Sequence, residues 1–107
     1  MTDREMLELA AKAAGLRLDE LGGRIVRREI DGQPVYWNPL TDDSDALRLA
    51  VKLRLVVDSG GVTPRNERIY VGGLEGYLAD EPTGTDIYAA TRRAIVKAVA
   101  EIGRGMA

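Results

Sequence analysis

The densest group of carboxylates in the chain follows Asn38 and could bind a hard cation. Asp42, Asp43 and Asp45 stand close together here, and Mg²⁺ or Ca²⁺ prefers carboxylate and amide oxygens as ligands. The spacing of Asp43 and Asp45 faintly resembles a calcium-binding loop, but the glycine and the distal glutamate of such a loop are missing. The same acids suit the start of a helix, where they cap free N–H groups and complement the helix dipole. We favour this structural role over a metal site or a Mg/Ca-dependent enzyme.

The composition excludes most of the familiar catalytic chemistries. The 107 residues include no histidine and no cysteine, so the usual acid–base group at neutral pH and all thiol chemistry are absent. The glycines at 72, 73 and 76 do not form a phosphate-binding loop, because the lysine and the following helix are missing. We therefore expect a protein that is not an enzyme and that needs no cofactor.

Basic side chains could form a binding surface on two of the predicted helices. If these helices pack side by side, the residues would make a positive patch that meets phosphates or an acidic protein. The net charge of -2 and the pI near 5.2 disfavour general nucleic-acid binding, and a solvated face is the simpler interpretation. The residues in question are Arg48, Lys52, Arg92, Arg93 and Lys97.

Two adjacent aromatic residues could serve as a stacking platform or as an anchor for a partner. Trp37 is the single tryptophan of the chain and precedes Asn38-Pro39, at the expected end of a strand. A tryptophan in this position is more typical of core packing, so we predict that Trp37 is buried. Tyr36 points to the opposite side of the strand and is the aromatic candidate for partner binding.

Three helices must position these residues. Thr2 and Glu5 have the spacing of a capping box, and Gly15 suits a left-handed helix end. Apolar residues at helical spacing indicate the helices themselves. They run over Asp3–Ala14, from a cap at Thr41 or Asp42 to about Leu53, and from a cap at Thr85 or Asp86 to about Ile102, where Gly103 ends the last one.

Short strands joined by glycine-containing turns fill the segments between the helices. Gly22-Gly23 and Asp31-Gly32 supply the positive φ that hairpin turns require and predict a three-stranded meander. A second β region begins at Leu55–Asp58 and continues as a hairpin. In that hairpin we expect strands over Glu67–Val71 and Leu74–Leu78, a turn at Gly72-Gly73, a bulge or edge at Gly76 and a loop over Asp80–Thr85.

These elements predict one α+β domain over residues 1–107. A mainly antiparallel sheet packs with three helices in the order α-β-β-β-α-β-β-β-α, as a layered sandwich. No apolar run reaches the length of about 20 residues that crosses a bilayer, and the charged N-terminus lacks an apolar signal core. We therefore expect a cytoplasmic protein without a membrane partner.

Three stretches of the chain resemble the phage ABA sandwich domain family of small phage and prophage proteins from proteobacteria. They are the start, MTDREMLELAAKAAG, the central YWNPLTDDSDALRLAVKL and the late IYAATRRAIVKAVAEIG. The resemblance implies a sheet between helical layers and a phage origin. It implies no activity and no catalytic residues.

The sequence thus favours a non-catalytic phage or prophage protein that binds a host or phage protein, such as a host-takeover or anti-defence factor in the bacterial cytoplasm. The alternatives are a nucleic-acid accessory protein with a basic helix face and a Mg/Ca-dependent enzyme at the acidic helix start. The alanines at 90, 94 and 98 would also permit close helix association, so a monomer and a homodimer stay open. The candidate partner-binding residues are Tyr36, Arg48, Lys52, Arg92, Arg93 and Lys97.

Overall fold

The computed structural model describes residues 1–28, 33–59 and 67–106 and contains three helices and six strands. Their order confirms the predicted α-β-β-β-α-β-β-β-α arrangement and the α+β class. Within the described ranges, no helix combines the length and the apolar character needed to cross a membrane. The elements are α1 (Asp3–Ala14), β1 (Leu18–Leu21), β2 (Arg24–Arg28), β3 (Pro34–Tyr36), α2 (Asp43–Lys52), β4 (Val56–Asp58), β5 (Arg68–Gly73), β6 (Gly76–Pro82) and α3 (Ile87–Arg104).

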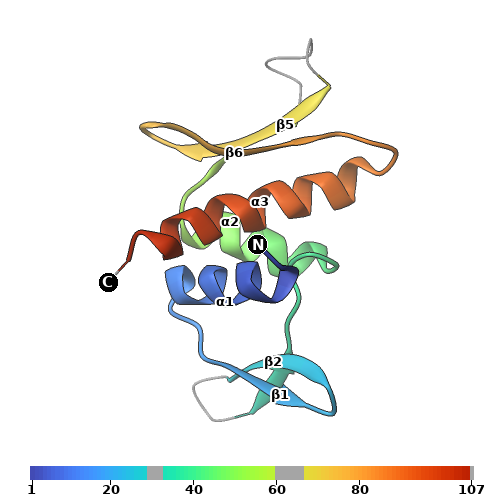
Figure 1. Cartoon of the computed structure of the whole chain (residues 1–107), viewed down its shortest axis with the longest axis vertical. Helices are drawn as coiled ribbons and strands as arrows, with labels where there is room; N and C mark the ends of the chain where they lie inside the picture. Colours follow the sequence, from blue (N-terminus) through green and yellow to red (C-terminus); the bar gives the residue numbers. More distant parts are fainter. Residues whose placement is uncertain (29–32, 60–66, 107) are drawn as a thin grey trace.

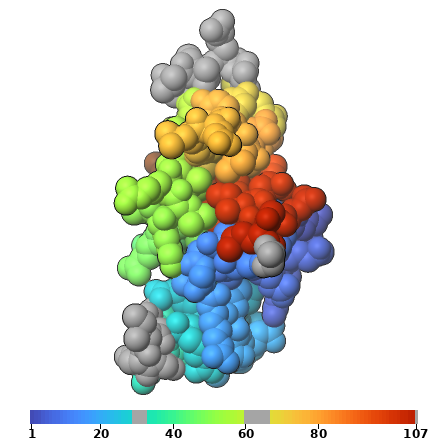
Figure 2. All heavy atoms as spheres, turned by 90° about the vertical axis from the view of Figure 1, so that its left-hand side faces the viewer, coloured from blue at the N-terminus to red at the C-terminus, as the bar shows by residue number. Residues whose placement is uncertain are grey.

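The helices form the middle of the molecule, between two separate antiparallel sheets. One sheet, which we call the lower sheet, has the strand order β1-β2-β3, and the other, the upper sheet, has the order β4-β5-β6. Figure 1 shows the upper sheet above α3, α1 beneath α3, and the lower sheet beyond α1. This stacking gives an elongated body of 45 × 31 × 24 Å, with the two sheets at opposite ends of its long axis (Figure 2). The layer order is the reverse of the sheet between helices that the family resemblance implies.

Local sequence signals place the helix ends as expected. The hydroxyl of Thr2 accepts a hydrogen bond from the Glu5 N–H, and the Glu5 carboxylate accepts one from the Thr2 N–H, which completes the capping box. Gly15 ends α1 in the left-handed conformation. Asp42 caps α2 and Asp86 caps α3, which decides between the two residues proposed for each cap.

One cluster of buried side chains joins the three helices to the upper sheet. Ala10 of α1, Val96 of α3 and Ile69 of β5 have no exposed surface, and Trp37 enters the same cluster with 3% exposure. The prediction that Trp37 is a core residue is therefore confirmed. The lower sheet is joined to this core through partly buried side chains such as Ile25.

The hairpin of the upper sheet corrects the predicted turn. β5 continues through Gly72 and Gly73, and the chain reverses at Leu74 and Glu75 instead. A side chain at Gly72 would overlap the backbone of Gly76, so this glycine permits close strand approach and does not form the turn. β6 runs on to Pro82, through residues expected to form a loop. It is an edge strand, which confirms the expected edge at Gly76, and the register shift of the hairpin lies between Val71 and Gly72.

The lower sheet contains one of its two predicted turns within the described residues. Gly22 and Gly23 both have positive φ and connect β1 to β2, as a two-residue hairpin turn requires. The predicted turn at Asp31-Gly32 lies outside the described residues.

Gly103 corrects a second prediction, because it does not end α3. The helix continues to Arg104, and Gly103 is buried where α3 crosses α1. A Cβ atom at this position would overlap the carbonyl oxygen of Leu9. The absent side chain thus sets the distance between the two helices.

We predict that Gly103→Ala destabilises the fold by about 1–3 kcal/mol, because overpacking forces the helices apart. The free energy of unfolding from urea denaturation measures the effect. Gly105→Ala is the matched control, since a Cβ there would make only ordinary contacts with the last turn of α3. Equal stability of the two variants would show that the α1–α3 crossing tolerates a side chain.

Candidate functional site

The acidic group at the start of α2 is engaged in local structure. Asp42 accepts a hydrogen bond from the Asp45 N–H at 2.9 Å, and Asp45 accepts one from the Asn38 N–H at 2.9 Å. Asp43 forms an ion pair with Arg92 at 2.6 Å. Among the described residues, no three histidine, cysteine or acidic side chains gather as potential metal ligands. Each of the three carboxylates therefore has a different partner, and together they connect the loop before α2 to α2 and α3.

Arg92 joins α3 to the beginning of α2. Besides its ion pair with Asp43, its Nε donates a hydrogen bond to the Leu40 carbonyl oxygen at 2.9 Å. Only 17% of its side chain is exposed. Arg92 therefore has a structural role in holding α3 against the start of α2, although the sequence made it a candidate for partner binding.

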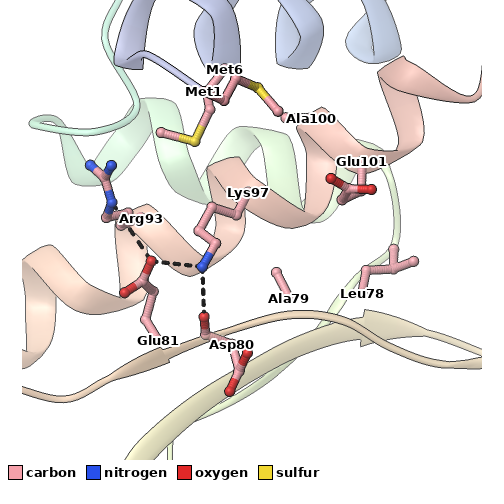
Figure 3. Close-up of a pocket in the computed structure, with 10 residues that line it drawn as sticks. All are labelled: Met1, Met6, Leu78, Ala79, Asp80, Glu81, Arg93, Lys97, Ala100 and Glu101. Atoms are coloured by element: carbon pink, nitrogen blue, oxygen red, sulfur yellow. Dashed lines mark hydrogen bonds and ion pairs between the residues drawn. The ribbon is translucent and has the colours of Figure 1, made fainter.

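Arg93 and Lys97 lie on another side of α3, in a charged cleft beside β6 (Figure 3). The Glu81 carboxylate is 2.9 Å from the Lys97 Nζ and 3.6 Å from Arg93, and its side chain is 17% exposed. Lys97 also donates to the Asp80 carbonyl oxygen at 2.9 Å. The cleft has a volume of about 350 Å³, but its cations are already balanced by protein groups.

The five basic candidates therefore do not form one patch. Arg92 faces the start of α2, and Arg93 and Lys97 face β6 and the N-terminal end of α1. Arg48 and Lys52 are exposed on α2, where neither makes a hydrogen bond or an ion pair within the described part of the chain. Only these last two have charges available to a partner.

Tyr36 is exposed, but its ring is already stacked against a cation. The Arg24 guanidinium lies 3.7 Å from the ring centroid, on the neighbouring strand. The two side chains border a cavity of about 420 Å³ that Asp42 and Asp45 also line. A base or an aromatic ligand that stacked on the same face of Tyr36 would have to displace Arg24.

An open, largely apolar cavity lies between α2 and the first turns of α3, and we call it the α2–α3 groove. Its volume is about 580 Å³, and its floor includes buried Ala46, Ala50 and Ile95. Its rim carries Leu47 and Tyr88, which are 63% and 71% exposed. The lining residues are Asp43, Ala46, Leu47, Ala50, Val57, Ser59, Ile87, Tyr88, Thr91, Arg92 and Ile95.

The exposed apolar surface continues along α2 beyond the groove. Val51, one turn after Leu47, is 67% exposed. Helical geometry spreads the apolar residues of α2 over an arc of about 200°, from Leu49 to Val51, which is wider than one packing stripe requires. The helical spacing puts Ala46, Leu49, Ala50 and Leu53 in one apolar stripe, with Leu47 and Val51 beside it. The width of this arc is the signal that could have revealed the groove.

The outer face of the upper sheet carries a second aromatic group. The rings of Tyr70 and Tyr77 are 5.0 Å apart, and the Tyr77 hydroxyl donates to the buried carboxylate of Asp58 at 3.2 Å. Partial burial raises the pKa of the Tyr77 phenol above its ordinary 10.0, and the hydrogen bond and negative charge of Asp58 raise it further. Tyr77 thus satisfies one oxygen of a buried carboxylate.

Comparison with protein-family models, with curated proteins and with solved structures finds no match to this chain. The role of each candidate residue therefore rests on the geometry described above. The resemblance to the phage ABA sandwich domain family stays a prediction.

We predict that Glu81→Gln lowers the free energy of unfolding by about 1 kcal/mol, because it removes the charge that balances Arg93 and Lys97 in a partly buried cleft. Urea denaturation measures the change. Glu101→Gln is the control, since the Glu101–Arg104 pair is exposed and should contribute less than about 0.5 kcal/mol. Equal losses in the two variants would contradict a special role for Glu81.

We predict that Asp58→Asn lowers the pKa of Tyr77 toward 10.0, because the variant removes the adjacent negative charge. Absorbance titration at alkaline pH measures the shift, and Tyr77→Phe identifies the contribution of this phenol. Since the folded-state pKa is raised, the contribution of the phenol to stability is complete below the unfolded-state pKa. It is lost as pH rises through the folded-state value. An unchanged titration in Asp58→Asn would contradict the assignment.

Proposed function

We propose that this chain is a small phage- or prophage-encoded protein without catalytic activity, which acts by binding a host or phage protein in the bacterial cytoplasm. The α2–α3 groove is the binding site in this proposal. The observation that carries it is the exposure of Leu47 and Tyr88 at one apolar cavity, continued along α2 by exposed Val51. The phage origin rests on the resemblance of three sequence stretches to a phage family.

Physical chemistry favours a protein partner for this surface. Contiguous apolar patches on a protein surface commonly mark interaction sites, and burial of a large apolar side chain contributes about 2 kcal/mol. Tyr88 adds a rigid aromatic side chain with a polar hydroxyl, which is a frequent anchor residue at interfaces. A few such contacts at the centre of an interface would supply most of its affinity.

The two alternatives have less support. A nucleic-acid accessory role would need free cations, and Arg92, Arg93 and Lys97 each pair with a carboxylate. A Mg/Ca-dependent enzyme would use Asp42 and its neighbours, whose oxygens already accept hydrogen bonds or an ion pair. The host-takeover or anti-defence role is one form that protein binding would take for a phage-encoded factor.

We predict that a photoreactive side chain in the groove crosslinks the partner. Tyr88→p-benzoylphenylalanine, expressed in the native bacterial strain and irradiated, should yield a discrete adduct of higher mass on a denaturing gel. The same side chain at Leu74, a still more exposed position at the β5–β6 turn, is the matched control and should yield no such adduct.

Point substitutions give the second half of this test. Leu47→Asp should abolish the Tyr88 adduct, because a carboxylate on the rim opposes burial of the apolar surface. Leu74→Asp should leave the adduct unchanged, and thermal melting should confirm that both variants stay folded. The absence of an adduct at position 88, or an identical adduct from position 74, would overturn the proposal.

A further inference from the structure

We infer that the occupant of the α2–α3 groove is an acidic amphipathic helix of the partner protein. This inference rests on the proposed function and adds the chemical nature of the bound segment. It follows from the arrangement of charged and apolar side chains along α2.

Two parallel stripes run along the outer side of α2. Leu47 and Val51 are one turn apart and form an apolar stripe at the groove. Arg48 and Lys52 follow each of them by one residue and form a basic stripe with the same spacing. Because residues four apart lie on one side of a helix, the two stripes stand next to each other.

No acid among the described residues balances the basic stripe. The side chains of Arg48, Lys52 and the following Arg54 make no hydrogen bond or ion pair within this part of the chain, whereas most other basic side chains there do. The acids nearest in sequence are engaged elsewhere. Asp43 pairs with Arg92, Asp45 accepts from the Asn38 N–H, and Asp58 accepts from the Tyr77 hydroxyl. In a chain of net charge -2, this basic border is a local reversal of sign.

A helix with an apolar stripe beside an acidic stripe complements both features at once. Its apolar side chains would enter between Leu47 and Tyr88, and its acids, spaced by one turn, would meet Arg48 and Lys52. A groove bounded by two helices suits a third helix, because side chains of facing helices interdigitate. The cations would then set the orientation and partner choice, while the apolar contacts supply affinity.

A second copy of this chain fits the surface poorly. A two-fold interface brings the same patch of both copies together, so the basic stripes of the two copies would oppose each other. Like charges in such a contact are unfavourable. A nucleic acid would use the cations but would leave the exposed Leu47, Val51 and Tyr88 without an apolar partner.

A display library of helical 16-residue peptides tests the inference. Each peptide keeps one leucine stripe, and the positions that flank it are randomised among Glu, Lys, Gln and Ala. Selection on the wild-type protein should enrich Glu at one-turn spacing beside the leucines. A selected peptide should bind at least about tenfold more weakly when its glutamates are changed to lysines, and its affinity should fall as salt rises.

Charge-reversal variants locate the effect on α2. Selection on Arg48→Glu/Lys52→Glu should enrich Lys in place of Glu at the flanking positions. Arg17→Glu/Arg104→Glu is the matched control, because it changes the net charge equally at two exposed positions outside the groove and should keep the preference for Glu. Leu47→Asp should abolish binding of the selected peptides.

Four results would overturn the inference. They are no enrichment of any peptide, a library indifferent to charge, a Glu preference that survives Arg48→Glu/Lys52→Glu, and displacement of the selected peptides by single-stranded DNA. A dimer in sedimentation equilibrium that Leu47→Asp dissociates would assign the groove to a second copy instead. A Tyr88 crosslink to a partner, combined with a charge-indifferent library, would overturn the acidic helix and leave the proposed function standing.

Discussion

The close crossing of α1 and α3 is the contact on which the rest of the architecture depends. Gly103 allows the α3 backbone to approach the Leu9 carbonyl, so the two longest helices share one layer of small, fully buried side chains. The other side of α3 is then available to cover Ile69 and Val71 of the upper sheet. A chain of this size can therefore support two separate sheets on a single helical layer (Figure 1).

Most polar side chains that look functional in the sequence hold this assembly together. Arg92 links α3 to the start of α2 through an ion pair, and Glu81 forms ion pairs with Lys97 and Arg93 across the cleft beside β6. Such charge pairs contribute little energy individually when exposed, but a partly buried pair is costly to break on one side. Their role explains why Arg92, Arg93 and Lys97 are not available to a partner, although they are basic and lie on one helix.

The position of α2 explains where a binding surface remains. α1 and the upper sheet both pack against α3, so α2 contacts the helical layer along one side only (Figure 1). Its other side carries Leu47 and Val51 into solvent, beside Arg48 and Lys52. The exposed surface and the unpaired cations thus have one common cause, the incomplete coverage of this helix by the rest of the fold.

The sequence by itself determined the element order and the helix caps. These features depend on interactions within a few residues: a capping side chain needs an N–H two or three positions away, and Gly15 needs only its own positive φ. The turn at Gly22-Gly23 is local in the same way. For this reason the α+β class could be predicted without any knowledge of packing.

The tertiary structure alone decided the layer order, the role of Gly103 and the location of the groove. Gly103 has the sequence properties of a helix end, yet distant Leu9 determines that it lies inside α3. An apolar residue such as Leu47 likewise reads as core until the position of every neighbouring element is known. Whether a side chain is buried or exposed depends on segments far away along the chain, and no local pattern contains that information.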